Sequence, residues 1–225
     1  LTDNLKAPVA QLFGEAVVLF KEKINFKMAG GGGFEPHQDS QAGWDKYADF
    51  YVSALVSIDE ATVENGCLQL CAGHHERGLF TSWEPLTEED MEGMEFVPCP
   101  TQPGDVVLFD CFAPHSSEPN LTDKTRRLYY ATYNRRSAGD HRTQYYADKH
   151  KNYPPDIDRD PAKDHREKRS PQRPTHHAHH GPVGRVGHHR LRINSHRKNG
   201  PPTSAVITPT GSSRGDMRVR APTSH

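Results

Sequence analysis

The chain has 225 residues, of which 33% are hydrophobic and 25% charged, and its formal net charge is −1. This length suffices for one domain with a hydrophobic core and a tail. The sequence has no run of 18 apolar residues and no secretory signal, so we expect neither a membrane-spanning protein nor a secreted one. Its four cysteines lack the spacing of metal or redox motifs and predict free thiols in a reducing compartment, the cytoplasm.

Composition changes abruptly near residue 165. Residues 1–165 carry a net charge of −11, whereas residues 166–225 carry +10, hold seven prolines and contain no Phe, Trp, Tyr or Cys. Such a segment cannot bury enough apolar surface to offset its chain entropy, so we predict a disordered basic tail. The tail could bind nucleic acid or metal non-specifically, but no aromatic side chains are interleaved for base stacking. A shifted reading frame or intron read-through would give the same change, and the sequence leaves this open.

The first predicted element is a helix over residues 8–22. Pro8 suits a first helical position, and the apolar residues that follow fall near one face. Residues 24–28 then alternate as a strand, with Asn25 and Lys27 on one side.

Short strands and turns fill the next hundred residues. We expect a glycine turn over 30–33, a strand beginning at 37–39, and a short acidic helix over 86–95 with Thr87 as its N-cap. Further strands are expected over 51–58, 67–71, 106–109 and 128–134. Several short strands with few helices favour an all-β barrel or jelly roll.

His37 and Asp39 are separated by one residue. Residues at this spacing point to the same side of a strand, so an imidazole and a carboxylate could bind one metal ion. His115, from a distant strand, would complete two histidines and one carboxylate, the set that suits non-haem Fe(II) and leaves positions open for a co-substrate and O₂. Taken singly, such residues are common: His115 could be a packing histidine and Arg126 a surface charge.

Three blocks of sequence give these residues a context. They are NFKMAGGGGFEPHQD at 25–39, ENGCLQL at 64–70 followed by GHH, and QPGDVVLFD at 102–110 followed by PHSSEPN and Arg126. The blocks resemble, in this order, the metal-binding core of the phytanoyl-CoA dioxygenase family. The resemblance covers roughly residues 15–160. It is strongest with the branch that includes the 2-aminoethylphosphonate dioxygenases.

The resemblance implies a double-stranded β-helix of the cupin type (a jelly roll) over residues 1–165, with a few flanking helices. It also implies an Fe(II)- and 2-oxoglutarate-dependent dioxygenase that hydroxylates a small organic substrate, a phosphonate among the candidates, and releases succinate and CO₂. His37, Asp39 and His115 would bind Fe(II). Arg126 matches the family's 2-oxoglutarate arginine, with Ser117 and Asn25 as further candidate ligands of the co-substrate. Because Asp39 is present, hydroxylation is expected rather than halogenation.

The substrate pocket is less defined. An anionic group could be held by Lys27 or Arg135, and an ammonium group could face Trp44 or Tyr47. The candidate pocket residues near the motifs are Lys27, Gln38, Trp44, Tyr47, Tyr129, Tyr133 and Arg135. Each could instead pack on a strand face or carry surface charge. The sequence predicts a small-molecule partner, no specific nucleic acid and no membrane, and it does not define the oligomeric state.

Two other functions fit the same residues. A catalytically inactive cupin-fold binding module, or a fragment, is one, because the chain begins with Leu and only 36 residues precede His37, where family members carry a longer segment. A metal-dependent hydrolase with zinc in the same ligands is the other. The hydrolase would leave Arg126 without a role and lacks a general base such as the glutamate of H-E-x-x-H.

Overall fold

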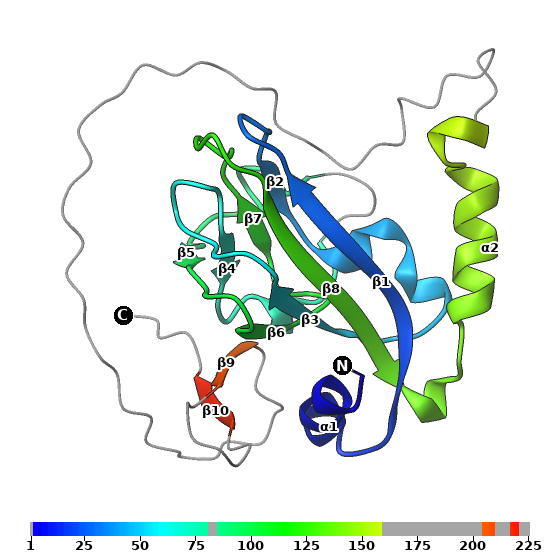
Figure 1. Ribbon diagram of the computed structural model, residues 1–225. Coiled ribbons are helices and arrows are strands. Elements are labelled where there is room, and N and C mark those ends of the chain that lie inside the picture. The colour runs from blue at the N-terminus through cyan, green and yellow to red at the C-terminus, as the bar shows by residue number, and fades with distance from the viewer. Residues whose placement is uncertain (1, 81–84, 159–203, 210–216, 221–225) are drawn as a thin grey trace.

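The computed structural model describes residues 2–80, 85–158, 204–209 and 217–220, and its core consists of two antiparallel sheets (Figure 1). The larger sheet has the order β1 (Val17–Lys27), β8 (Arg126–Arg135), β3 (Val52–Ser57), β6 (Val106–Asp110), β9 (Ser204–Pro209) and β10 (Met217–Arg220). The smaller sheet has the order β2 (Phe34–His37), β7 (His115–Ser117), β4 (Leu68–Cys71) and β5 (Phe96–Cys99). This is the jelly roll that the sequence predicts.

Apolar side chains fill the space between the sheets and cover the outside of the larger one. Between the sheets, Leu55 and Phe109 of the larger sheet pack with Leu70 of the smaller. On the outside, α1 (Thr2–Phe13) buries Leu5 and Val9 against the larger sheet. These two layers hold the strands that carry the candidate metal ligands.

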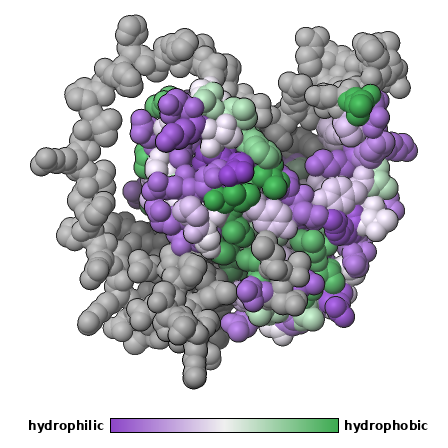
Figure 2. All heavy atoms as spheres, viewed as in Figure 1, coloured by the Kyte–Doolittle hydropathy of each residue, from purple (hydrophilic) through white to green (hydrophobic). Residues whose placement is uncertain are grey.

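β1 shows the alternation expected of a strand with one buried face. Ile24 and Phe26 are 50% and 57% exposed, whereas Lys27 is only 3% exposed. Figure 2 shows hydrophobic residues gathered in a band between hydrophilic ones on the face seen in Figure 1. From Lys21 to Lys27, after the bulge in β1, the odd-numbered residues therefore point into the jelly roll and the even-numbered ones point away from it.

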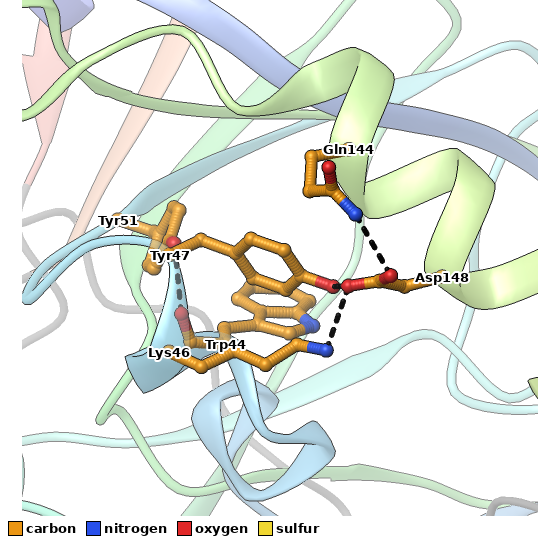
Figure 3. Close-up of polar contacts among 6 residues, drawn as sticks. All are labelled: Trp44, Lys46, Tyr47, Tyr51, Gln144 and Asp148. Carbon is orange, nitrogen blue, oxygen red and sulfur yellow. Dashed lines mark hydrogen bonds and ion pairs between the residues drawn. The ribbon is translucent and has the colours of Figure 1, made fainter.

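A second helix, α2 (Arg142–Asn152), runs beside β1 (Figure 1) and was not expected from the sequence. The short 3₁₀ helix η2 (Trp44–Lys46) and the residue after it hold α2 through Asp148 (Figure 3). Tyr47 Oη donates to Asp148 Oδ2 at 2.6 Å, and Lys46 Nζ lies 2.9 Å from the same oxygen. Gln144 Nε2 donates to Asp148 Oδ1 at 2.9 Å. The contacts from Lys46 and Tyr47 hold α2 beside the segment that follows the candidate metal ligand Asp39.

The helix expected over residues 8–22 was placed wrongly. The helix spans Thr2–Phe13, Pro8 lies inside it rather than at its first position, and residues 17–22 belong to β1. Gly14 ends the helix at φ 70°, a conformation that costs glycine little. The β-branched Val17 and Val18 then pair with β8, and this tertiary pairing overrides the helical spacing of the apolar residues.

The helix expected over residues 86–95 is a series of turns instead. Thr87 does take the capping role, because its Oγ1 accepts a hydrogen bond from the Asp90 N–H at 3.1 Å. Gly93, at φ 76°, breaks the run, and the chain enters β5, which pairs with β4. β5 is a further strand that the sequence did not indicate.

Two strands lie in the segment 166–225, for which disorder was predicted. β9 pairs antiparallel with β6, and β10 pairs with β9. The edge of β6 offers unpaired backbone N–H and C=O groups, which can order a segment with little apolar surface of its own. The rest of that prediction lies outside the described residues. No helix in the described ranges has the length and apolar character needed to cross a membrane.

Candidate metal and co-substrate site

The structure brings His37, Asp39 and His115 together. Each offers one ligand atom, and these atoms lie within 4.8 Å of one another. His37 on β2 is directly opposite His115 on β7, and the two imidazole centroids are 4.2 Å apart. Two imidazoles and a carboxylate at this spacing are a donor set that fits Fe(II).

Asp39 reaches this position differently from the prediction. β2 ends at His37, and Asp39 is the first residue of the 3₁₀ helix η1 (Asp39–Ala42). The turn is fixed by the Gln38 N–H, which donates to Gln41 Oε1 at 2.7 Å. The two residues thus share a site because the chain turns between them, and strand alternation is not the reason.

Backbone carbonyls set the tautomers of the two histidines. His37 Nδ1 lies 2.7 Å from Glu35 O, and His115 Nδ1 lies 2.9 Å from Ala113 O. A carbonyl can only accept, so each Nδ1 carries the hydrogen and each Nε2 presents a lone pair. Burial lowers the pKa of His37 to about 3 and also lowers the pKa of His115. Both imidazoles are therefore neutral at physiological pH, as metal binding requires.

The carboxylate is ionised. Burial opposes ionisation of Asp39, but neighbouring groups, Lys21 foremost, outweigh it and lower the pKa to about 2. Ser53 Oγ also donates to Asp39 Oδ2 at 3.2 Å. One negative and two neutral ligands would leave a divalent ion with a net positive charge that can attract an anionic co-substrate.

A second cluster lies at the start of β8. Arg126, 3% exposed, is opposite Lys27 of β1, and both side chains donate to the carbonyl oxygen of Gly66. Lys27 Nζ also donates to Ser117 Oγ at 2.8 Å and to Glu118 O. Burial, with the Arg126 charge next, lowers the pKa of Lys27 to about 7. Arg126, Lys27 and a hydroxyl converge here, and groups of these kinds can together bind a carboxylate.

Gly66 can be only glycine at this point. Its φ is 72°, and an added Cβ would lie 2.1 Å from Glu118 O and 2.7 Å from Lys27 Nζ. A side chain at residue 66 would therefore displace the Glu118 backbone and the Lys27 ammonium, which bond each other in this cluster. Lys27, predicted as a substrate ligand, lies beside Arg126 and Ser117.

The other predicted pocket residues are placed as follows. Asn25 is on the inner face of β1, opposite Leu128 and two residues before Lys27. Gln38 uses its amide to bond Gly78 O, Phe112 O and the Phe80 N–H, which is an arrangement that favours a structural role. Tyr133 packs among the residues under α1, and Arg135 lies over Phe13 of that helix. Trp44 is buried with Phe20 and Tyr51, and Tyr47 is bonded to Asp148.

Several side chains near the metal ligands were missed. Lys21, Lys23 and Tyr130 act electrostatically on the ligands, and Ser53 bonds Asp39. The alternation of β1 continues back from Lys27 and would have indicated both lysines, but the predicted helix covered Lys21 and the predicted strand began only at residue 24.

Known proteins resemble this chain over its described core. The phytanoyl-CoA dioxygenase (PhyH) family model matches residues 2–128. A 2-aminoethylphosphonate dioxygenase from uncultured bacterium HF130_AEPn_1 is 40% identical over 166 residues, 70% of this chain and 61% of that protein. A methylphosphonate hydroxylase from Gimesia maris is 41% identical over 144 residues, 63% of this chain and 55% of that protein. The chain thus spans about three fifths of the length of these relatives.

Solved structures agree with the fold. EctD from S. alaskensis, crystallised with 2-oxoglutarate and 5-hydroxyectoine, is 29% identical with a TM-score of 0.54, over 60% of this chain and 50% of that one. The apo form of EctD gives 27% identity and a TM-score of 0.51, over 59% and 50%. These likenesses confirm the predicted jelly-roll fold class.

Proposed function

Because the chain belongs to the phytanoyl-CoA dioxygenase family, we propose that it is an Fe(II)- and 2-oxoglutarate-dependent dioxygenase that hydroxylates a small organic substrate. The observation that carries the proposal is the pairing of two sites. One is the set of donors from His37, Asp39 and His115 within 4.8 Å. The other is the buried cluster of Arg126, Lys27 and Ser117.

Different residues would bind the metal and the co-substrate. The two Nε2 atoms and the Asp39 carboxylate would hold Fe(II), which, with 2-oxoglutarate and O₂ bound, supplies the oxidising chemistry. The Arg126 guanidinium, a planar fork of donors, suits the distal carboxylate of 2-oxoglutarate, with Ser117 as a further donor. Lys27 would add a second positive charge there. Asn25, on the same face of β1, would lie along the co-substrate.

The relatives favour a phosphonate as the substrate. The two proteins compared above are described as acting on 2-aminoethylphosphonate and methylphosphonate. An acidic small molecule of this kind suits a site whose metal ligands are surrounded by lysines. We also place the enzyme in the cytoplasm, which is supported by four cysteines that are all free thiols.

Anaerobic titration of the Fe(II)-loaded protein with 2-oxoglutarate tests the proposal. A saturable visible charge-transfer band is expected, because the keto acid would chelate the iron. Asp39→Ala should remove the band, and succinate release should require 2-oxoglutarate. A folded protein that holds iron but gives no band would overturn the proposal. Chelator-sensitive hydrolysis without 2-oxoglutarate would favour the hydrolase instead.

A further inference from the structure

The inner face of β1 carries two lysines toward the metal ligands. Lys21 pairs with Thr132 of β8, and Thr132 pairs in turn with Ser53 of β3. Paired residues on neighbouring strands point to the same side of the sheet. Ser53 bonds both Thr132 and Asp39, so this row of side chains ends at the metal site. Lys23 begins the next row, opposite Tyr130.

A third lysine approaches from α2. Lys149 follows Asp148, the residue through which η2 holds the helix (Figure 3). Tyr145, one turn earlier, packs on Phe20 of β1 with ring centroids 4.5 Å apart. The Lys149 ammonium lies 5.8 Å from the Tyr145 ring. Tyr146, on the same helix, bonds the backbone of Glu22, which lies between Lys21 and Lys23. These contacts hold α2 beside this part of β1, and the Lys149 charge acts on Lys21.

These three lysines form no ion pair in the part of the chain that the structure describes. The Lys21 Nζ lies 3.6 Å from the centroid of the Trp44 ring. Burial lowers the pKa of Lys21 to about 7, and Asp39 only partly opposes this. Asp39 is also the proposed metal ligand, so its charge would be shared with the ion. None of the three ammonium groups pairs with a carboxylate in the described residues, so a bound anion would stabilise their charged forms.

We infer that Lys21, Lys23 and Lys149 form a subsite for the anionic group of the substrate, a tetrahedral oxyanion of the phosphonate or phosphate class. The inference rests on the proposed function, which places the substrate beside the metal. Separate ammonium groups suit a compact multivalent oxyanion, whereas the planar fork of Arg126 suits a carboxylate. Lys21 and Lys27 are six residues apart on β1, roughly 20 Å at the strand rise, so the two anion sites are distinct.

Calorimetric titration with methylphosphonate, under anaerobic conditions, in Fe(II) and saturating 2-oxoglutarate, tests the subsite. Saturation fills the Arg126 pocket, so that the probe reports on the lysines. Lys21→Met and Lys149→Met should each weaken binding at least about 10-fold, as removal of one charge-assisted contact does. Lys21→Arg keeps the charge and should bind within threefold of the unchanged chain. Lys151→Met, which removes an exposed lysine from the same helix, should do likewise.

The outcomes separate this inference from the proposed function. A retained 2-oxoglutarate band with weakened methylphosphonate binding in the Met variants supports both. A retained band with methylphosphonate affinity unchanged in those variants, or with no binding to the unchanged chain, overturns the subsite alone. In the absence of a band, titration without 2-oxoglutarate decides. Binding of methylphosphonate that depends on the lysines would then support the subsite and overturn the proposed dioxygenase function. Circular dichroism checks that each variant is folded.

Discussion

The hydroxyl of Ser53 donates a hydrogen bond to Asp39 Oδ2 at 3.2 Å and lies 2.9 Å from Thr132 Oγ1. An ionised carboxylate can only accept, so Ser53 must donate to Asp39 and receive the Thr132 hydrogen. Ser53 lies on β3, so the larger sheet orients the proposed metal ligand Asp39, which none of its own strands carries. This contact compensates for the position of Asp39, which lies in a turn after β2.

Ser53→Ala should weaken Fe(II) binding. Loss of a group that orients a metal ligand typically costs about 10- to 100-fold in affinity, and we expect the lower end because the carboxylate itself remains. Competition with a chromophoric chelator measures the affinity. Ser57→Ala is the matched control: Ser57 lies on the same strand, is also buried, and bonds Thr101 at 2.5 Å. Equal losses in the two variants would mean that Ser53 acts only through stability.

Arg126→Ala should raise the 2-oxoglutarate concentration needed for half-saturation by about 30-fold or more, since truncating one partner of a buried charge pair costs about 2–5 kcal/mol. The visible band of the Fe(II) chelate gives the value. Arg127→Ala is the control, because Arg127 is half-exposed and pairs with Asp59 at 2.8 Å on the surface. The half-saturating 2-oxoglutarate concentration of Arg127→Ala should stay within threefold of that of the unchanged chain. Similar effects at both positions would show that the loss is not specific to the pocket.

The affinity for 2-oxoglutarate should fall as pH rises above 7. The pKa of Lys27 is lowered to about 7 by burial and Arg126, and Glu118 and Cys67 oppose this shift. Below that pH the free protein already carries the ammonium charge; above it, binding the carboxylate must take up a proton. The affinity should therefore decline by up to tenfold per pH unit between about 7 and 9. Lys27→Met should flatten this profile, and a wild-type slope retained in that variant would assign the titration elsewhere.

The order of the sequence motifs predicted His37, Asp39 and His115 as metal ligands and Arg126 as a co-substrate ligand. The structure groups the first three in one site, and their roles stay predictions. The prediction that His37 and Asp39 lie on one face of a strand was wrong, because Asp39 lies in the turn after β2. The turn after His37 depends on hydrogen bonds of Gln38 with Gln41, Gly78 and Phe112, and spacing alone cannot show long-range contacts of this kind.

The errors elsewhere have one physical origin. Residues 17–22 satisfy a helical pattern and a strand pattern equally, and only the distant β8 decides between them. β9 depends in the same way on the open edge of β6. Because Lys21 fell in the misassigned helix and Lys23 lay between that helix and the predicted strand, the candidates chosen for an anionic group were Lys27 and Arg135. The structure places Lys27 beside Arg126 and Ser117, and Arg135 over Phe13 of α1.

Phe20→Ala should be strongly destabilising. Phe20 is fully buried, and its ring contacts Trp44, Tyr51 and Tyr145, so that it joins β1, η2 and α2. Truncating a buried phenylalanine costs about 3–5 kcal/mol. Phe26→Ala makes the same change on the same strand, but its side chain is 57% exposed, and it should cost less than about 0.5 kcal/mol. Urea unfolding measures both free energies. A small cost at Phe20 would contradict the packing described for α2.

Ending the chain after residue 165 should preserve the fold but promote self-association. The three buried clusters and the candidate metal ligands all lie before residue 159, so the melting temperature should change by less than about 3 °C. β6 would lose its partner β9 and become an exposed edge with the apolar sequence VVLFD, which can pair with a second copy. Sedimentation velocity measures the association. Val106→Lys in the shortened chain should suppress it, because a charge at a strand edge opposes pairing. A large drop in melting temperature would mean instead that the segment beyond residue 165 contributes to the core.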